Sequence, residues 1–139
     1  MQRPFLLLLL LSTALLTRAQ EVKLLQVQDP THDFGDIPQG KPVTYTFVLY
    51  NRSPDTVRFK HVEASCGCTT PHWRDAPIPP GDSTILPVTY NAAGDGRFTK
   101  SITLFYSSNL RQMLYIRGFV WKTPDTSVPL NAGIQLVKQ

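Results

Sequence analysis

This chain of 139 residues has little cysteine, no concentration of charge of one sign, and no long apolar segment beyond its first residues. Its 14 basic residues stand against 10 acidic ones, and the basic residues are scattered, mostly alternating with apolar residues. A nucleic-acid-binding protein needs a concentrated basic surface that neutralises phosphates. We therefore expect no nucleic-acid partner.

The long apolar run, Phe5 to Leu16, follows Arg3 at the start of the chain. At roughly a dozen residues, it is shorter than the ~20 that a transmembrane helix needs. Thr17 and Ala19 place small residues at the two key positions of a cleavage site, so residues 1–19 are predicted to be a secretory signal peptide. No cysteine follows that site, which argues against a lipid anchor. We expect a periplasmic or secreted protein with no membrane insertion after signal removal.

The remainder has no sustained helical period. Its 12 prolines and 8 glycines lie between short runs rich in aromatic and β-branched residues, which is all-β composition. This predicts a β-sandwich domain over residues 20–121, followed by a tail over 122–139. Six strands are predicted, over residues 22–28, 43–51, 57–64, 84–91, 98–106 and 112–121, with a seventh either around Phe34 or in Ile134–Val137.

The clearest of these strands is Val43–Asn51, where the period of two is unbroken. We assign the face that carries Tyr45, Phe47 and Leu49 to the core. Just before this strand, Phe34 and Ile37 lie between turn residues and are expected to be buried anchors.

Three local features interrupt the regular pattern. Phe59 and Val62, the best core candidates of their strand, are three residues apart, which predicts a bulge near Lys60–His61. Pro80-Gly81 fits the central positions of a type II turn. Pro87 lacks a backbone N–H, so we expect its strand to lie at a sheet edge or to carry a bulge.

Both cysteines fall in one stretch, Ser65-Cys66-Gly67-Cys68-Thr69, which has three open interpretations. The first is a disulfide, which an exported compartment permits. Residues two apart in a straight strand are separated by about 6.6 Å, near the upper limit for bridging, so Gly67 would supply a kink. Closing so short a loop contributes about 1.6 kcal/mol in the chain-entropy relation. Such a strained bond suits redox work better than stapling.

The second interpretation is a metal site. Cys66 and Cys68 would share one face of a strand, so their thiolates could converge, with His72 as a third ligand. Two thiolates suit a soft ion such as Cu(I), which makes copper the cofactor under this interpretation. The third interpretation assigns no chemistry: the cysteines are small buried groups at a tight strand end, and Gly67 is present for its φ freedom.

Other candidate residues do not assemble a catalytic set. His32 and Asp33 resemble half of a hydrolytic triad, but neighbours in a strand point to opposite faces. The chain also has no Gly-x-Ser-x-Gly elbow. Trp73, in a proline-rich loop, is expected to cover one end of the core; the alternative is an exposed recognition anchor. We expect no enzyme activity.

Five motifs in chain order resemble the exported bacterial family catalogued as domain of unknown function 1573, which is common in Bacteroidetes. The resemblance covers roughly residues 30–120. It implies an immunoglobulin-like antiparallel β-sandwich of about seven strands, similar to ASH and major-sperm-protein domains, and it implies no catalytic residues. The motifs are Phe34-Gly35, Phe47-x-Leu49-x-Asn51, Ser65-Cys66-Gly67-Cys68-Thr69, Pro80-Gly81 and Ile116-x-Gly118-x-Val120.

Together these features predict a non-enzymatic binding or scaffolding module that uses loops and sheet edges. Its partner is expected to be a protein or glycan of the cell envelope. An exposed edge strand could accept an extended segment by strand addition. The alternative function is a copper-handling or thiol-redox protein that acts through Cys66, Cys68 and His72.

Overall fold

The computed structural model describes residues 25–106 and 109–122. Within these ranges the secondary structure is eight β-strands without a helix, so no described segment could cross a membrane as a helix. The predicted signal peptide 1–19 and the alternative strand in Ile134–Val137 lie outside the described residues. The strands are β1 Leu25–Val27, β2 Thr31–Pro38, β3 Val43–Asn51, β4 Phe59–Ala64, β5 Thr69–Pro71, β6 Ser83–Tyr90, β7 Gly96–Tyr106 and β8 Arg111–Trp121.

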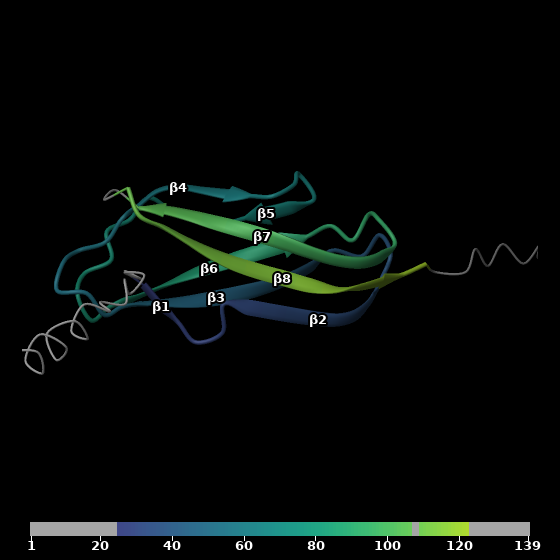
Figure 1. The fold of residues 1–139 in the computed structure, drawn as a ribbon, viewed down its shortest axis with the longest axis horizontal. Coiled ribbons are helices and arrows are strands. Elements are labelled where there is room, and N and C mark those ends of the chain that lie inside the picture. The colour runs from purple at the N-terminus through teal and green to yellow at the C-terminus, as the bar shows by residue number, and fades with distance from the viewer. Residues whose placement is uncertain (1–24, 107–108, 123–139) are drawn as a thin grey trace, which may run out of the picture.

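These strands form two four-stranded sheets packed face to face (Figure 1). Sheet A has the order β1-β3-β6-β5, and sheet B has the order β2-β8-β7-β4. Every pair is antiparallel except β2 and β8, which are parallel. The all-β sandwich predicted from the sequence is therefore confirmed, with one parallel pair in place of a fully antiparallel arrangement.

The start of the domain contributes to both sheets. β1 pairs with the end of β3 in sheet A, and β2 then pairs with β8 in sheet B. The change of sheet falls at Asp29-Pro30, just after the first predicted strand, where proline cannot donate a ladder hydrogen bond. β2 keeps the direction of β1 after the crossing and runs alongside β8 in the same direction (Figure 1).

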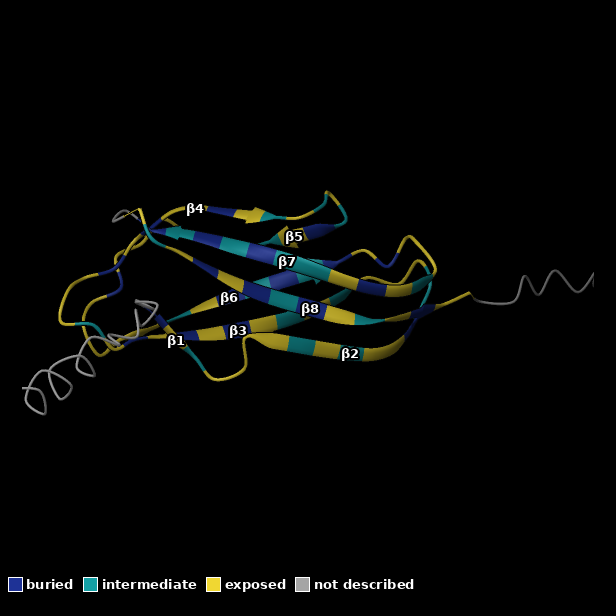
Figure 2. Cartoon of the chain, viewed as in Figure 1, coloured by how far each residue is buried: buried dark blue, intermediate teal, exposed yellow. Residues whose placement is uncertain are grey.

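The core between the sheets follows from the period of two. In β3, Phe47 and Leu49 are buried while Thr46 and Val48 face outward. Figure 2 shows this alternation of buried and lighter bands along the strands. Tyr45 and Phe34, predicted to be buried, are only partly buried, because both lie at the margin of the sandwich. Inward rows on the other long strands are Leu86, Val88 and Tyr90; Ile102, Leu104 and Tyr106; and Leu114, Ile116 and Val120.

Two of the predicted local features are confirmed. The register of β4 against β7 shifts between Phe59 and His61, which is the expected bulge. Gly81 has a φ of 79°, and the N–H of Asp82 donates to the carbonyl of Pro79 at 3.1 Å, so Pro80-Gly81 forms the expected turn.

The prediction for Pro87 is wrong. Its strand, β6, lies between β3 and β5, and its register with β3 is regular. The carbonyl of Pro87 accepts a hydrogen bond from the N–H of His72 at 2.8 Å, just beyond the end of β5. Because N–H and C=O of one residue point to the same side of an antiparallel strand, the missing donor faces His72, just beyond the end of β5. The ladder between β6 and β3 therefore loses no hydrogen bond.

The strand that sequence reasoning missed is β5, which has only three residues. A segment of this length cannot display a period of two. It forms because the turn at the cysteines brings Thr69 opposite Tyr90 in β6.

Candidate functional site

The Cys66-Gly67-Cys68 stretch forms the corner that joins the two sheets. It follows β4, an edge strand of sheet B, and precedes β5, an edge strand of sheet A. Cys66 and Cys68 are joined by a disulfide, with their Cα atoms 5.2 Å apart. We call this segment the disulfide corner.

Backbone hydrogen bonds hold the disulfide corner to both sheets. The N–H of Thr69 donates to the carbonyl of Cys66 at 3.2 Å and closes a four-residue turn. The N–H of Asn91, after β6, donates to the carbonyl of Cys68 at 3.0 Å, and the N–H of Ser65 donates to the carbonyl of Ser101 in β7 at 2.9 Å. The corner is therefore fixed independently of its sulfur atoms.

The expectation that Gly67 supplies φ freedom is wrong. Its φ is not in the left-handed region, where four other glycines of the described residues lie. A Cβ added at Gly67 would meet nothing within 4 Å. The two cysteines are half-buried rather than fully buried, and Cys68 packs against the edge of the core.

His72, predicted as a possible third metal ligand, makes its side-chain contact with Thr89 and not with the cysteines. Its Nε2 lies 3.2 Å from Oγ1 of Thr89, on the exposed face of β6. The described residues contain no group of three metal-ligating side chains. In the disulfide form the sulfurs of Cys66 and Cys68 are bonded to each other, so a copper site stays a prediction for the reduced chain only.

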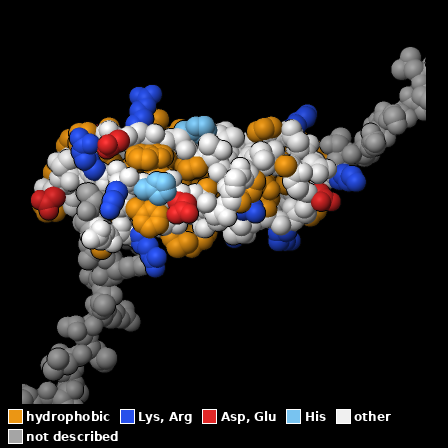
Figure 3. All heavy atoms as spheres, turned by 90° about the horizontal axis from the view of Figure 1, so that it is seen from above, with side chains coloured by type: hydrophobic (Ala, Val, Ile, Leu, Met, Phe, Trp, Pro, Cys, Tyr) orange, Lys and Arg blue, Asp and Glu red, His pale blue; other side chains and the backbone are white. Residues whose placement is uncertain are grey.

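Trp73 covers part of the core, as predicted. It packs against the core cluster, and its ring meets that of Phe59 edge-on at a centroid distance of 6.4 Å. Figure 3 looks onto this side of the sandwich, along β4 and β5, and shows acidic and basic side chains intermixed rather than a surface of one sign.

The pair His32-Asp33 is divided between the two faces of β2, as predicted. Asp33 lies outside, where its Oδ2 accepts from Nε of Arg117 at 2.9 Å. The backbone N–H of Gly35 donates to Oδ1 of Asp33, and this hydrogen bond, more than Arg117, lowers the pKa of that carboxyl. Asp33 therefore forms a salt bridge on the outer face of β2, and His32 lies on the inner face.

His32 belongs to an aromatic cluster between β2 and β3, which we call the edge cluster: His32, Phe34, Tyr45 and Phe47. His32 stacks on Tyr45 with ring centroids 3.6 Å apart and meets Phe34 edge-on at 4.7 Å. Tyr45 in turn meets Phe47 edge-on at 4.8 Å. Burial lowers the pKa of His32, while the charge of Asp33 acts in the opposite direction.

Beside the edge cluster, β3 has a free edge. β6 pairs with β3 from Val43 to Tyr50, but β1 pairs with it only at Leu49–Asn51. No described residue pairs with Val43–Val48 on the side away from β6, and we call this segment the open edge. The open edge leaves the neighbouring strand of sheet B poorly covered. In Figure 2, β2 is yellow and teal over most of its length, which marks exposed and partly buried residues.

The outer face of sheet A carries an apolar patch next to the open edge. Val48 and Ile85 are direct cross-strand neighbours, with exposed fractions of 37% and 62%. Tyr50 lies two residues further along β3 on the same face, with the guanidinium of Arg52 5.5 Å from its ring centre. A surface groove of about 630 Å³, lined in part by Trp73 and Pro87, reaches Ile85 from the β5 side.

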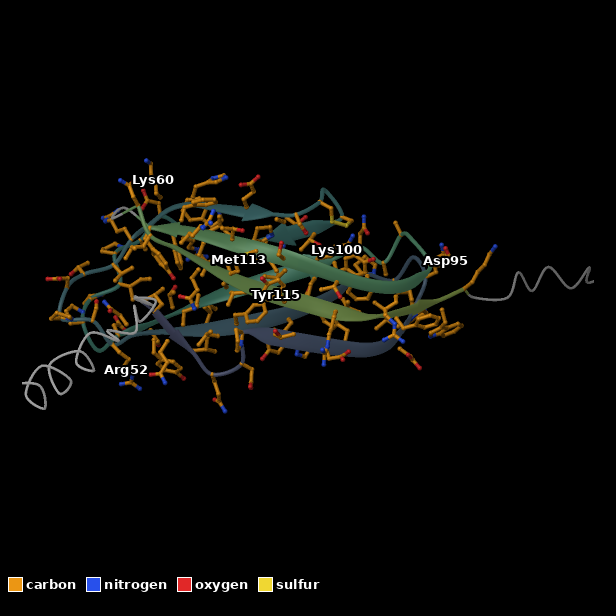
Figure 4. All side chains as sticks on the ribbon, viewed as in Figure 1. Arg52, Lys60, Asp95, Lys100, Met113 and Tyr115 are labelled. Atoms are coloured by element: carbon orange, nitrogen blue, oxygen red, sulfur yellow. A yellow bond between two sulfur atoms is a disulfide. The ribbon has the colours of Figure 1, made fainter. Side chains whose placement is uncertain are left out.

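The outer face of sheet B differs in character. Figure 4 labels Met113 and Tyr115 there, midway along β8, and the hydroxyl of Tyr115 lies 3.6 Å from the sulfur of Met113. Of the charged side chains that it labels, Arg52, Lys60 and Asp95 lie toward the ends of the sandwich, and Lys100 lies along β7 between them. Phe119 and Trp121 are also exposed on this face, but Arg97 lies directly across from Phe119, whereas Val48 and Ile85 on sheet A are cross-strand neighbours of each other.

Most of the described chain matches a known family. The family model described as protein of unknown function (DUF1573) matches residues 25–120, and the chain is a member of that family. This confirms the resemblance seen in the sequence motifs. No curated protein matches the chain at a significant level.

Three solved structures share the fold. A protein of unknown function from Porphyromonas gingivalis W83 has a TM-score of 0.61 at 16% identity, over 69% of this chain. The chain spans only 46% of that protein's length. The ASH/PapD-like domain of human CEP192 has a TM-score of 0.61 at 9% identity, over 81% of this chain and 97% of that one. WR4, a major-sperm-protein family member of C. elegans, has a TM-score of 0.51 at 10% identity, over 72% and 100%.

At these identities the likeness concerns the fold alone. The domain is an immunoglobulin-like β-sandwich of the kind found in ASH and major-sperm-protein domains, as predicted. The open edge and the apolar patch were not found by sequence reasoning, because each depends on which strands are neighbours. The signal for the open edge was present in part, since Val43–Asn51 is long and carries no charge, glycine or proline.

Proposed function

We propose that this protein is an exported, non-enzymatic module that binds another protein of the cell envelope. The observation that carries the proposal is the apolar patch of Val48, Tyr50 and Ile85 on the outer face of sheet A. Apolar side chains that are exposed and contiguous mark surfaces that a partner covers. Export is supported by the signal sequence predicted in residues 1–19.

The chemistry of the patch favours a protein over a glycan. Val48 and Ile85 offer no hydrogen bonds, so sugar hydroxyls placed on them would lose water without replacement. An apolar protein surface loses nothing comparable and gains from burial, at about 25 cal/mol per Å². The patch therefore supports an apolar protein surface as the partner.

Capture from an envelope extract tests the proposal. The exported chain is immobilised as wild type, as Ile85→Lys, and as Thr99→Lys, which places the same charge on the exposed outer face of sheet B. We expect one protein to be captured by the wild type and by Thr99→Lys and to be lost with Ile85→Lys. Equal capture by all three forms, or capture of polysaccharide without protein, would overturn the proposal.

A further inference from the structure

We infer that the open edge of β3 receives an extended segment of the partner protein as an additional antiparallel strand of sheet A. This inference rests on the proposed function, because it requires a protein partner. Four independent features of the margin between β2 and β3 support it, and they also specify the chemistry of the segment.

The first feature is a row of unused backbone groups. The carbonyl of Pro87 points toward β5, so Thr46, its register partner, has its N–H and C=O on the opposite side, away from β6. By alternation, Thr44 and Val48 present their N–H and C=O to the same side. Among the described residues, none pairs with these groups. A neighbouring strand would find three donors and three acceptors already aligned.

The second feature is that the other edges are protected and this one is not. Native sheets block their edges with short strands, bulges, prolines and charges. β1 and β5 have three residues each. β2 has a register shift between Asp33 and Asp36, and β4 has a bulge and carries Lys60 and Glu63. The open edge is regular and reads Val-Thr-Tyr-Thr-Phe-Val, with none of these devices.

The third feature is the incomplete burial of the edge cluster. His32 and Phe34 point inward from β2, at the margin where β3 is the outermost described strand of sheet A once β1 has ended. Tyr45 is half-buried for the same reason. A strand added beside Val43–Val48 would occupy that position, and its inward side chains would cover these rings.

The fourth feature is continuity with an existing strand. β1 occupies the same side of β3 at Leu49–Asn51, in antiparallel register, with Gln26 opposite Tyr50. A partner strand in the same direction would extend the row that β1 begins. The free length of six residues corresponds to about 20 Å of strand.

These features define the segment by its side chains. Residues opposite Tyr45 and Phe47 would point inward and should be apolar or aromatic. Residues opposite Thr46 and Val48 would lie beside the apolar patch on the outer face and should be β-branched or apolar. The segment should carry no proline at a position whose N–H faces β3.

The test uses the exported chain and a phage library of random nine-residue peptides. We expect enriched peptides with apolar or β-branched residues at alternate positions. A synthetic copy of the strongest peptide should bind Thr46→Pro with a Kd at least about tenfold higher, because one edge donor is removed and the ring obstructs the new strand. Thr99→Val, on the exposed outer face of sheet B, is the control, and its Kd should match that of the wild type.

A second measurement does not depend on a variant. In the wild-type protein, saturating peptide should slow hydrogen exchange of the amides of Thr44, Thr46 and Val48. The amides of Tyr45 and Phe47 face β6 and should change little. This every-second-residue protection is specific to strand addition at β3.

The other outcomes overturn the inference in separate ways. Equal binding to Thr46→Pro, or protection that maps elsewhere, would place the partner on another surface and leave the proposed function standing. Protection of Thr46 without peptide, with a dimer in solution, would make a second copy the occupant. If the wild type captures no envelope protein, the proposed function itself fails.

Discussion

The imidazole ring of His32 on β2 lies parallel to the phenol ring of Tyr45 on β3, with ring centroids 3.6 Å apart and planes 6° apart. This contact joins the two sheets at the margin where sheet A ends. Because burial lowers the pKa of His32, the neutral imidazole is the form that the folded state prefers.

Acidification should therefore weaken the folded state through His32. A histidine whose pKa in the folded state lies below the ordinary value of 6.5 contributes stability above pH 6.5, and that stability is lost as the pH falls below 6.5. His32→Phe keeps a ring and removes the titration. Between about pH 7.5 and about pH 5, its Tm should fall less than that of the wild type. The wild type and His32→Phe have all other titrating groups in common. Equal losses of Tm in the two proteins would therefore show that protonation of His32 does not affect the stability of the fold.

Removing the Asn51 side chain should be costly. Asn51 is fully buried, and its Nδ2 donates to the carbonyls of Asp55 and Ile78, both at 2.8 Å. Asn51→Leu would remove these two hydrogen bonds and the two that Oδ1 of Asn51 accepts from Ser53, at a cost of about 2–3 kcal/mol in the free energy of unfolding. Urea denaturation measures the loss. Asn91→Leu, whose amide oxygen accepts from the N–H of Ala93 at an exposed turn, is the control and should change stability much less. Similar losses in the two variants would argue against a special role for the buried network.

Gly118 in β8 should not tolerate a side chain. A Cβ there would lie 2.8 Å from the carbonyl oxygen of Gly35 and 2.9 Å from Cε1 of Phe98. We expect Gly118→Ala to lose about 1–3 kcal/mol through overpacking, measured as a lower Tm. Gly67→Ala, with nothing within 4 Å and an ordinary φ, is the matched control and should change stability by less than about 0.5 kcal/mol. A stable Gly118→Ala would mean that β2 can shift away from β8.

Removing the disulfide should be mild. Cys66 and Cys68 enclose only Gly67, so the chain-entropy relation assigns the bond about 1.6 kcal/mol. The double variant Cys66→Ser with Cys68→Ser should remain folded, because the backbone hydrogen bonds of the corner do not involve sulfur. Denaturation of the variant and of the reduced wild type should give the same loss. An unfolded variant would show that the bond, rather than the hydrogen bonds, holds the corner.

Local patterns in the sequence predicted much of the fold. The unbroken alternation in Val43–Asn51 predicted the strand and its buried face, and the spacing of Phe59 and Val62 predicted the bulge of β4. Pro80-Gly81 predicted its turn. Each of these depends on residues close together in the chain, where the steric and hydrogen-bonding causes are also local.

Features that depend on strand order could not be predicted in the same way. Pro87 predicted an edge strand, yet β6 is internal. Proline is tolerated there because β5, which comes from a different part of the chain, ends just before the position opposite Pro87. The open edge likewise exists because β1 stops at Val27 and the chain crosses to sheet B. Cys66 and Cys68 were placed at a strand end, but their role in joining the two sheets depends on that same long-range order.

The parallel pairing of β2 with β8 has a mechanical consequence. A pull that draws the start of β2 and the end of β8 in opposite directions loads their ladder along its length, because parallel strands present these two ends at opposite extremities. The six registered pairs from Thr31–Tyr115 to Pro38–Trp121 would then share the force and yield together rather than one at a time. In a domain tethered by its two ends, the pull on the first strand would act on the three β1–β3 pairs before it reached this longer ladder, so the row beside the open edge would give way first.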